Sequence, residues 1–121
     1  MLVVDAANVI GSRPTGWWRD RPGAARRFTE DVRAAVAAGR LAAPVAVVLE
    51  GRSREGAEES ELDGVRVVHA PGEGDDTIAE LAASHPGSVV VTADRDLAGR
   101  ARACAAEVVG PRWLLDRIGV R

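Results

Sequence analysis

Short valine-rich runs alternate along this chain with longer stretches of helical spacing, and this alternation restricts the fold more than any other feature. The apolar, mostly β-branched runs lie at 2–4, 45–49, 65–68, 89–91 and 108–109. They are continuous rather than interleaved with polar residues, which is typical of strands covered on both faces. The segments at 22–40, 75–85, 96–106 and 111–118 carry helical spacing or helix-start signals and are predicted helices.

This alternation predicts an α/β fold of three layers, α/β/α, similar to a Rossmann fold. Its central parallel sheet should have about five strands in the order 3-2-1-4-5, numbered along the chain. The 121 residues fit a single domain, 1–121. The segment 52–63 contains two arginines and five acids, and the sequence is compatible with either a short helix or a mobile loop there.

The composition excludes several classes of protein. All 16 basic residues are arginine, so every mechanism that needs a lysine is excluded, including Schiff-base chemistry and P-loop nucleotide hydrolysis. A net charge of −2 does not fit a basic nucleic-acid coat protein. There is no apolar run of ~20 residues to span a membrane and no basic leader of a signal peptide. Because the single Cys104 also fits a reducing cytosol, we expect a cytoplasmic protein without membrane contact.

Six acids follow predicted strands or begin predicted helices. They are Asp5, Glu73, Asp75, Asp76, Asp94 and Asp96. In an open parallel sheet, ligands bind beyond the carboxyl ends of the strands, so these acids are expected at one edge. Carboxylates gathered in one place repel each other unless a cation balances them. Mg²⁺ prefers oxygen ligands and suits this set, whereas the lack of His and Cys clusters argues against zinc.

Each group of acids also has a purely structural interpretation. Asp5 and Asp94 are suitable helix N-caps, and Asp75 with Asp76 suits the first turn of a helix. Their occurrence together at three matching strand ends favours a metal site over caps alone.

The segments VVDAANVIGS, EGDDTIAEL and VVVTADRDL resemble the three acidic motifs of the PIN-like nuclease superfamily, particularly the YacP-like members of its NYN branch. The resemblance implies Mg²⁺- or Mn²⁺-dependent cleavage of RNA, or sometimes DNA, by a metal-bound water. It assigns a metal-ligand role to all six acids and a catalytic role to all of them except Glu73. It also implies that Asn8 orients Asp5 or contacts phosphate, that Thr92 is the hydroxyl residue before the late acid pair, and that Glu50 is an outer acid.

A basic, tryptophan-containing segment follows the first strand. Residues 13–40 hold seven arginines and three acids, and Trp17 and Trp18 lie among them. Arginine binds phosphates and tryptophan stacks on bases, so this segment is a candidate surface for single-stranded RNA. The candidates are Arg13, Trp17, Trp18, Arg19, Arg21 and Arg26. The alternatives are a tryptophan packed on the core beside solvated arginines, or a homodimer interface through Trp17 or Trp18.

Together these features predict a divalent-metal-dependent ribonuclease, with endonucleolytic cleavage favoured. The alternatives are a non-catalytic RNA-binding module of the same fold, a toxin-type PIN ribonuclease and a nucleotide phosphohydrolase. The toxin reading is weakened because Glu30 and Asp31 sit poorly for the acid that toxin-type proteins carry on the helix after the first strand. A Toprim-like domain fits less well, because it places Glu after the first strand.

Overall fold

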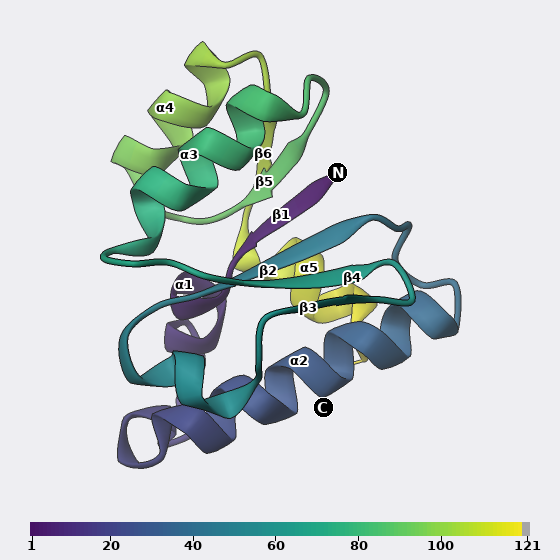
Figure 1. Cartoon of the computed structure of the whole chain (residues 1–121), viewed down its shortest axis with the longest axis vertical. Helices are drawn as coiled ribbons and strands as arrows, with labels where there is room; N and C mark the ends of the chain where they lie inside the picture. Colours follow the sequence, from purple (N-terminus) through teal and green to yellow (C-terminus); the bar gives the residue numbers. More distant parts are fainter. Residues whose placement is uncertain (120–121) are drawn as a thin grey trace.

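The computed structural model describes residues 1–119 and has a central sheet of six strands with helices on both faces (Figure 1). The strands are β1 (Leu2–Asp5), β2 (Val45–Leu49), β3 (Ser60–Leu62), β4 (Val65–His69), β5 (Val89–Val91) and β6 (Glu107–Val109). Their order is β3-β4-β2-β1-β5-β6, and every neighbouring pair is parallel except β3 with β4. The predicted order of the five predicted strands is therefore confirmed.

The helices confirm the four predicted ones and add others that the sequence did not predict. They are α1 (Ala6–Gly11), α2 (Arg21–Ala37), α3 (Gly74–Ser84), α4 (Arg95–Ala103), α5 (Pro111–Arg117) and the 3-10 helices η1 (Trp17–Arg19) and η2 (Gly51–Gly56). α1 was missed because six residues are too few to show a helical period. It begins directly at the end of β1, so it fixes the direction in which the chain leaves the sheet.

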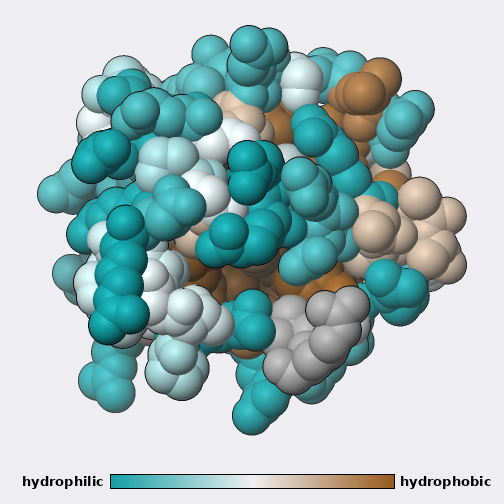
Figure 2. Space-filling model, turned by 90° about the horizontal axis from the view of Figure 1, so that it is seen from below, coloured by the Kyte–Doolittle hydropathy of each residue, from teal (hydrophilic) through white to brown (hydrophobic). Residues whose placement is uncertain are grey.

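Two apolar cores lie on opposite faces of the sheet. Leu2 and Val4 of β1 pack with α1, α2 and α5, whereas Val3 between them packs with α3 and α4. This follows from the two-residue repeat of a strand, which directs successive side chains to opposite faces. Figure 1 shows α3 and α4 above the sheet and α2 below it. The prediction of strands covered on both faces is therefore confirmed. The surface seen from below is mainly hydrophilic, with apolar side chains in a central hollow (Figure 2).

The open segment 52–63 forms most of η2 and then β3, which the sequence analysis did not predict. β3 is a short, mostly exposed edge strand without the valine run of the other strands, so hydrophobicity gave no sign of it. Its turn into β4 did carry a signal. Asp63 and Gly64 both have positive φ angles, of 52° and 81°, and an Asp-Gly pair of this kind is a strong hairpin signature.

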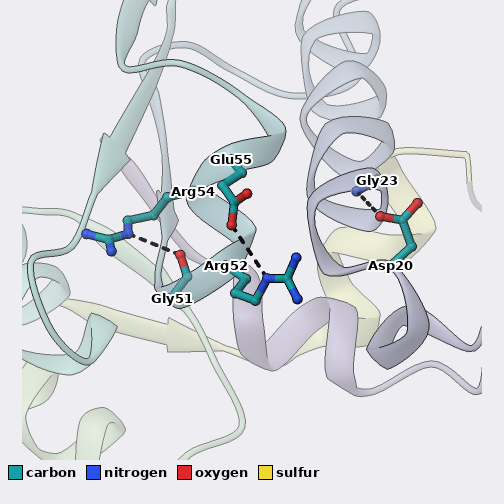
Figure 3. A network of polar contacts seen from close by, with 6 residues as sticks. All are labelled: Asp20, Gly23, Gly51, Arg52, Arg54 and Glu55. Atoms are coloured by element: carbon teal, nitrogen blue, oxygen red, sulfur yellow. Dashed lines mark hydrogen bonds and ion pairs between the residues drawn. The ribbon is translucent and has the colours of Figure 1, made fainter.

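η2 packs closely on the first turns of α2. A Cβ atom on Gly56 would overlap the carbonyl oxygen of Pro22, so only glycine fits at this contact. Figure 3 shows the polar contacts that shape the two segments. They are Arg54 Nε to the Gly51 carbonyl oxygen (3.1 Å), Arg52 to Glu55 (3.5 Å) and the Gly23 N–H to Asp20 Oδ1 (2.9 Å). Each of these polar contacts lies within η2 or at the start of α2, and the close approach at Gly56 is what brings the two segments together.

Candidate active site

Asp5, the last residue of β1, is the most buried of the candidate acids. It is 6% exposed, and a carboxylate in such a place must be hydrogen-bonded to be tolerated. The Thr92 hydroxyl donates to Asp5 Oδ2 (2.9 Å), and the backbone N–H of Asn8 donates to Asp5 Oδ1 (3.4 Å). Val4 pairs with Val91 across the sheet, so the next residues, Asp5 and Thr92, lie side by side at the carboxyl ends of their strands.

The side chain of Asn8 links α1 to the loop between β5 and α4. Its Oδ1 accepts the backbone N–H of Ala93 (2.8 Å), and the Thr92 hydroxyl accepts the N–H of Asp94 (3.1 Å). Asn8 thus contacts Asp5 through its backbone and positions the loop through its side chain. Thr92 serves both strand ends, because it donates to Asp5 and accepts from the residue that begins the next motif.

Electrostatic coupling connects Asp5 to acids from three other elements. Burial raises the pKa of Asp5 from its ordinary 3.8 to about 6, with smaller upward contributions from the negative charges of Glu50 and Asp75, while the hydrogen bonds from Thr92 and Asn8 lower it. Burial likewise raises the pKa of Asp75, as do the charges of Asp94 and Glu73, whereas Arg100 lowers it. The charge of Asp76 also raises the pKa of Asp75, with the smallest contribution, but Asp76 is ion-paired with Arg100. The other acids grouped by these couplings, which we call the Asp5 cluster, are Asp5, Glu50, Glu73, Asp75 and Asp94.

Glu50 acts on Asp5, whose pKa its charge raises, and it also lies close to the start of α3. It follows β2, the neighbour of β1, and its Oε1 lies 3.1 Å from the place that a Cβ atom would take on Gly74. Gly74 is the first residue of α3, whose N-terminal end favours a negative charge. The glycine therefore lets the Glu50 carboxylate approach the start of the helix that carries Asp75.

The structure does not bring all six predicted acids together. Asp76 forms an ion pair with Arg100 of α4 (3.0 Å), and its side chain is 82% exposed. Asp96 is exposed in the first turn of α4, and Glu73 is exposed just before α3. Because successive helical residues point about 100° apart, Asp75 and Asp76 are not expected to face the same spot.

Two of the acids also have the structural role that the sequence allowed. Asp5 caps α1 through the Asn8 N–H, and Asp94 caps α4 by accepting the N–H of Leu97 (2.9 Å). Capping alone does not account for the burial of Asp5 or for the acids that surround it, since a cap functions well at the surface.

The cluster suits a hydrated hard cation better than a closed metal site. Within residues 1–119, no three His, Cys, Asp or Glu side chains are close enough together to hold a metal ion. That arrangement does not fit structural zinc, which needs four protein ligands. Mg²⁺ commonly keeps several waters and takes only one or two protein carboxylates plus substrate phosphate, so Asp5 with one further acid of the cluster would suffice as its protein donors.

The predicted RNA surface contains an alternating group of tryptophans and arginines, which we call the Trp-Arg group. Arg19 lies over Trp18 (5.7 Å) and Arg21 over Trp17 (5.1 Å), and the two indole rings meet edge to face at 5.9 Å. Trp18 is 53% exposed, whereas Trp17 is half-buried and lies against Gly11 at the end of α1. Arg26 is exposed on α2, and Arg13 is half-buried in the loop after α1. The packing alternative therefore suits Trp17, and Trp18 remains available to a ligand.

The fold is a three-layer α/β domain whose acids gather at the carboxyl ends of its parallel strands. The crystal structure of Rae1 (YacP) from Bacillus subtilis, determined for a point mutant, has the same fold: the TM-score is 0.67 over 98% of this chain and 73% of that chain, with 20% sequence identity. At this identity the likeness concerns the fold, and YacP is the branch that the sequence motifs resemble. The sequence matches no known family profile and no curated protein. No helix in residues 1–119 is long and apolar enough to cross a membrane.

Proposed function

We propose that this chain is a divalent-metal-dependent ribonuclease that hydrolyses RNA internally at the Asp5 cluster. The observation that carries the proposal is the burial of Asp5 beside Glu50 and Asp75, because like charges are assembled at a cost where a cation is to be bound. The PIN-like fold and the YacP-like motifs support the same conclusion.

The residues of the cluster divide the work. Asp5 and one further carboxylate, that of Asp75 or Asp94, would hold Mg²⁺ or Mn²⁺, and the remaining acids of the cluster would add negative charge around it. A bound ion of this kind polarises phosphate oxygens and makes water a better nucleophile at neutral pH. Thr92 fixes Asp5 in one rotamer through the 2.9 Å hydrogen bond, and Asn8 holds the loop that carries Asp94. Fixed ligands matter because small displacements of reacting groups reduce rates strongly.

The test is cleavage of a labelled RNA pool by the purified protein in Mg²⁺, Mn²⁺ or EDTA. We expect cleavage with either metal, none in EDTA, and loss of about a hundredfold or more in Asp5→Asn and Asp94→Asn. Asp63→Asn is the matched control: it makes the same chemical change at an exposed turn, where asparagine tolerates the positive φ. Cleavage that continues in EDTA, or that survives in Asp5→Asn, would show that this cluster is not the catalytic site.

A non-catalytic RNA-binding module is the second candidate, and one observation favours it. No three ligand-type side chains converge in the described part of the chain, 1–119, so the cluster is not pre-assembled for a metal. Such a module would bind RNA with equal affinity in EDTA and in Mg²⁺ and would cut nothing. Binding and cleavage measured on the same RNA therefore separate the two functions.

A further inference from the structure

Three surface hollows lie in a continuous row beside the candidate site. The first, of about 260 Å³, lies between α1 and α2, and the second, of about 670 Å³, lies between the loop 12–15 and the start of α5. The third, of about 500 Å³, lies between α4 and the end of β6. Arg13, Thr15 and Leu115 line both the first and the second hollow, and Ala93 lines both the second and the third. Shared walls make the three hollows one path.

Arginines line this path along its whole length. They are Arg13, Arg27, Arg95, Arg102 and Arg112, and we call them the arginine row. The acids among the lining residues are Asp31 and Asp116, so the path has a local excess of three positive charges. Among residues 1–119, none of the five guanidinium groups forms an ion pair or a hydrogen bond within the protein. Unpaired guanidinium groups are available for the bidentate recognition of phosphate.

The path comes nearest to the Asp5 cluster at Thr92 and Ala93: the cluster acids do not line the hollows themselves, but Thr92 donates its hydroxyl to Asp5 and Ala93 precedes Asp94. Ala93, which joins the second and third hollows, stands between Thr92 and Asp94 and gives its N–H to Asn8. A polyanion in the path would have Arg13 and Arg112 on one side of Ala93 and Arg95 and Arg102 on the other. A chain held on both sides presents its middle to the acids, which is the geometry of an internal cut.

We propose that the arginine row binds the sugar-phosphate backbone of single-stranded RNA across the Asp5 cluster, an inference that rests on the proposed ribonuclease function and names its substrate. A single strand is favoured over a duplex because Leu115 and Val109 line the hollows between the arginines. Bases contact such apolar walls through their faces, and those faces are accessible only in unpaired nucleotides. Only Arg13 of the row belongs to the RNA surface predicted from the sequence.

The experiment measures binding without cleavage, so that its outcome is independent of catalysis. Fluorescence anisotropy in EDTA would follow a labelled single-stranded RNA of roughly 12 nucleotides, within the range that such surfaces cover. The variant is Arg102→Gln/Arg112→Gln, with one change on each side of Ala93. The control is Arg40→Gln, an exposed arginine at the opposite edge of the sheet, beside Met1 and Pro44.

We expect the double variant to bind about tenfold more weakly and to lower the slope of log affinity against log salt by roughly 1.4, about 0.7 for each lost phosphate contact. Arg40→Gln should change neither quantity, and duplex RNA should compete more weakly than single-stranded RNA. The proposal is overturned if the double variant keeps the wild-type salt slope, if Arg40→Gln loses as much affinity, or if duplex RNA competes equally well. Intact binding without any cleavage in Mg²⁺ would instead count against the proposed enzyme and leave the arginine row in place.

Discussion

Asp5→Asn should stabilise the domain at neutral pH while it abolishes the proposed activity. In the folded protein the pKa of Asp5 is about 6, against an ordinary value of 3.8, because the side chain is buried among other acids. Below about pH 3 the residue is protonated in both the folded and the unfolded chain, so its burial does not change the free energy of unfolding. As the pH rises to about 6, the unfolded chain loses this proton first, and the folded state becomes less stable by about 3 kcal/mol in all.

Asparagine at position 5 removes this buried charge, but it also removes the hydrogen bond that Asp5 accepts from Thr92. The hydroxyl of Thr92 donates to Asp5 Oδ2, and an amide nitrogen at that position would face it as a second donor. One hydrogen bond is worth about 1 kcal/mol, so the net gain expected at about pH 7 is about 1–2 kcal/mol. For a domain of this size that corresponds to a rise of about 4–8 °C in Tm. At about pH 3 only the lost hydrogen bond remains, and the variant should be slightly less stable than the wild type.

Urea and thermal unfolding, followed by circular dichroism in EDTA at about pH 3 and about pH 7, measure both stability differences. Asp63→Asn, in an exposed turn, should show no such pH dependence. Saturating Mg²⁺, at about one hundred times its Kd, should stabilise the wild type by about 2.7 kcal/mol and Asp5→Asn much less. If Asp5→Asn destabilises the domain equally at both pH values, the argument from burial is refuted.

Three further changes have distinct expected outcomes. Arg100→Gln removes a cation that lowers the pKa of Asp75, so Mg²⁺ should bind more tightly in a calorimetric titration. The free energy of unfolding should change by less than about 1 kcal/mol, because the Arg100–Asp76 ion pair is exposed. Weaker Mg²⁺ binding would contradict the assignment of Asp75 to the metal site. Gly56→Ala should destabilise the domain by about 1–3 kcal/mol in urea unfolding, because the added methyl group would clash with α2. Gly72→Ala is the control, since there is open space around Gly72, and it should not destabilise the domain. Equal effects of the two changes would show that the structure relaxes to remove the clash at position 56. Trp18→Ala should weaken single-stranded RNA binding by about 1–3 kcal/mol in an anisotropy assay and leave Tm nearly unchanged, since the side chain is half exposed; unchanged affinity would exclude stacking on it.

The sheet was predictable because its parallel strands are covered on both faces and therefore consist of nearly pure valine runs. β3 lacked that signature because it is an exposed edge strand, and only the Asp63–Gly64 turn indicated it. α1 was hidden because its first turn begins at an acid that had been interpreted chiefly as a metal ligand. Sequence patterns thus located the buried elements well and the exposed or very short ones poorly.

The candidate site was predictable to the level of strand ends and not to the level of individual side chains. Asp5, Asp75 and Asp94 lie in one cluster as expected, since parallel strands bring their carboxyl ends to one edge. Asp76 and Asp96 belong to the same motifs, yet one pairs with Arg100 and the other is exposed. Helical geometry separates neighbours in sequence, and the motif alone does not say which of them points inward.

The arginines of the proposed RNA path were harder still to predict. Arg95, Arg102 and Arg112 are spread over three elements and form no basic run in the sequence. The local concentration of positive charge in residues 13–40 contains Arg13 and Arg27 but gives no indication of Arg95, Arg102 or Arg112. A surface assembled from single residues on different elements becomes visible only once the fold is known.

The double use of Asp5 and Asp94 as helix caps has a consequence for how relatives of this chain should be compared. A cap is kept for the sake of the helix, so a homologue that had lost all chemistry would still be selected for Asp, Asn, Ser or Thr at these two positions. Glu50 and Asp75 lie at the N-terminal end of α3, where a negative charge is favoured whether or not the site works. Retention of Asp itself at positions 5 and 94, where Asn, Ser or Thr would also cap the helix, is therefore the evolutionary signature that distinguishes a working site from an inherited scaffold.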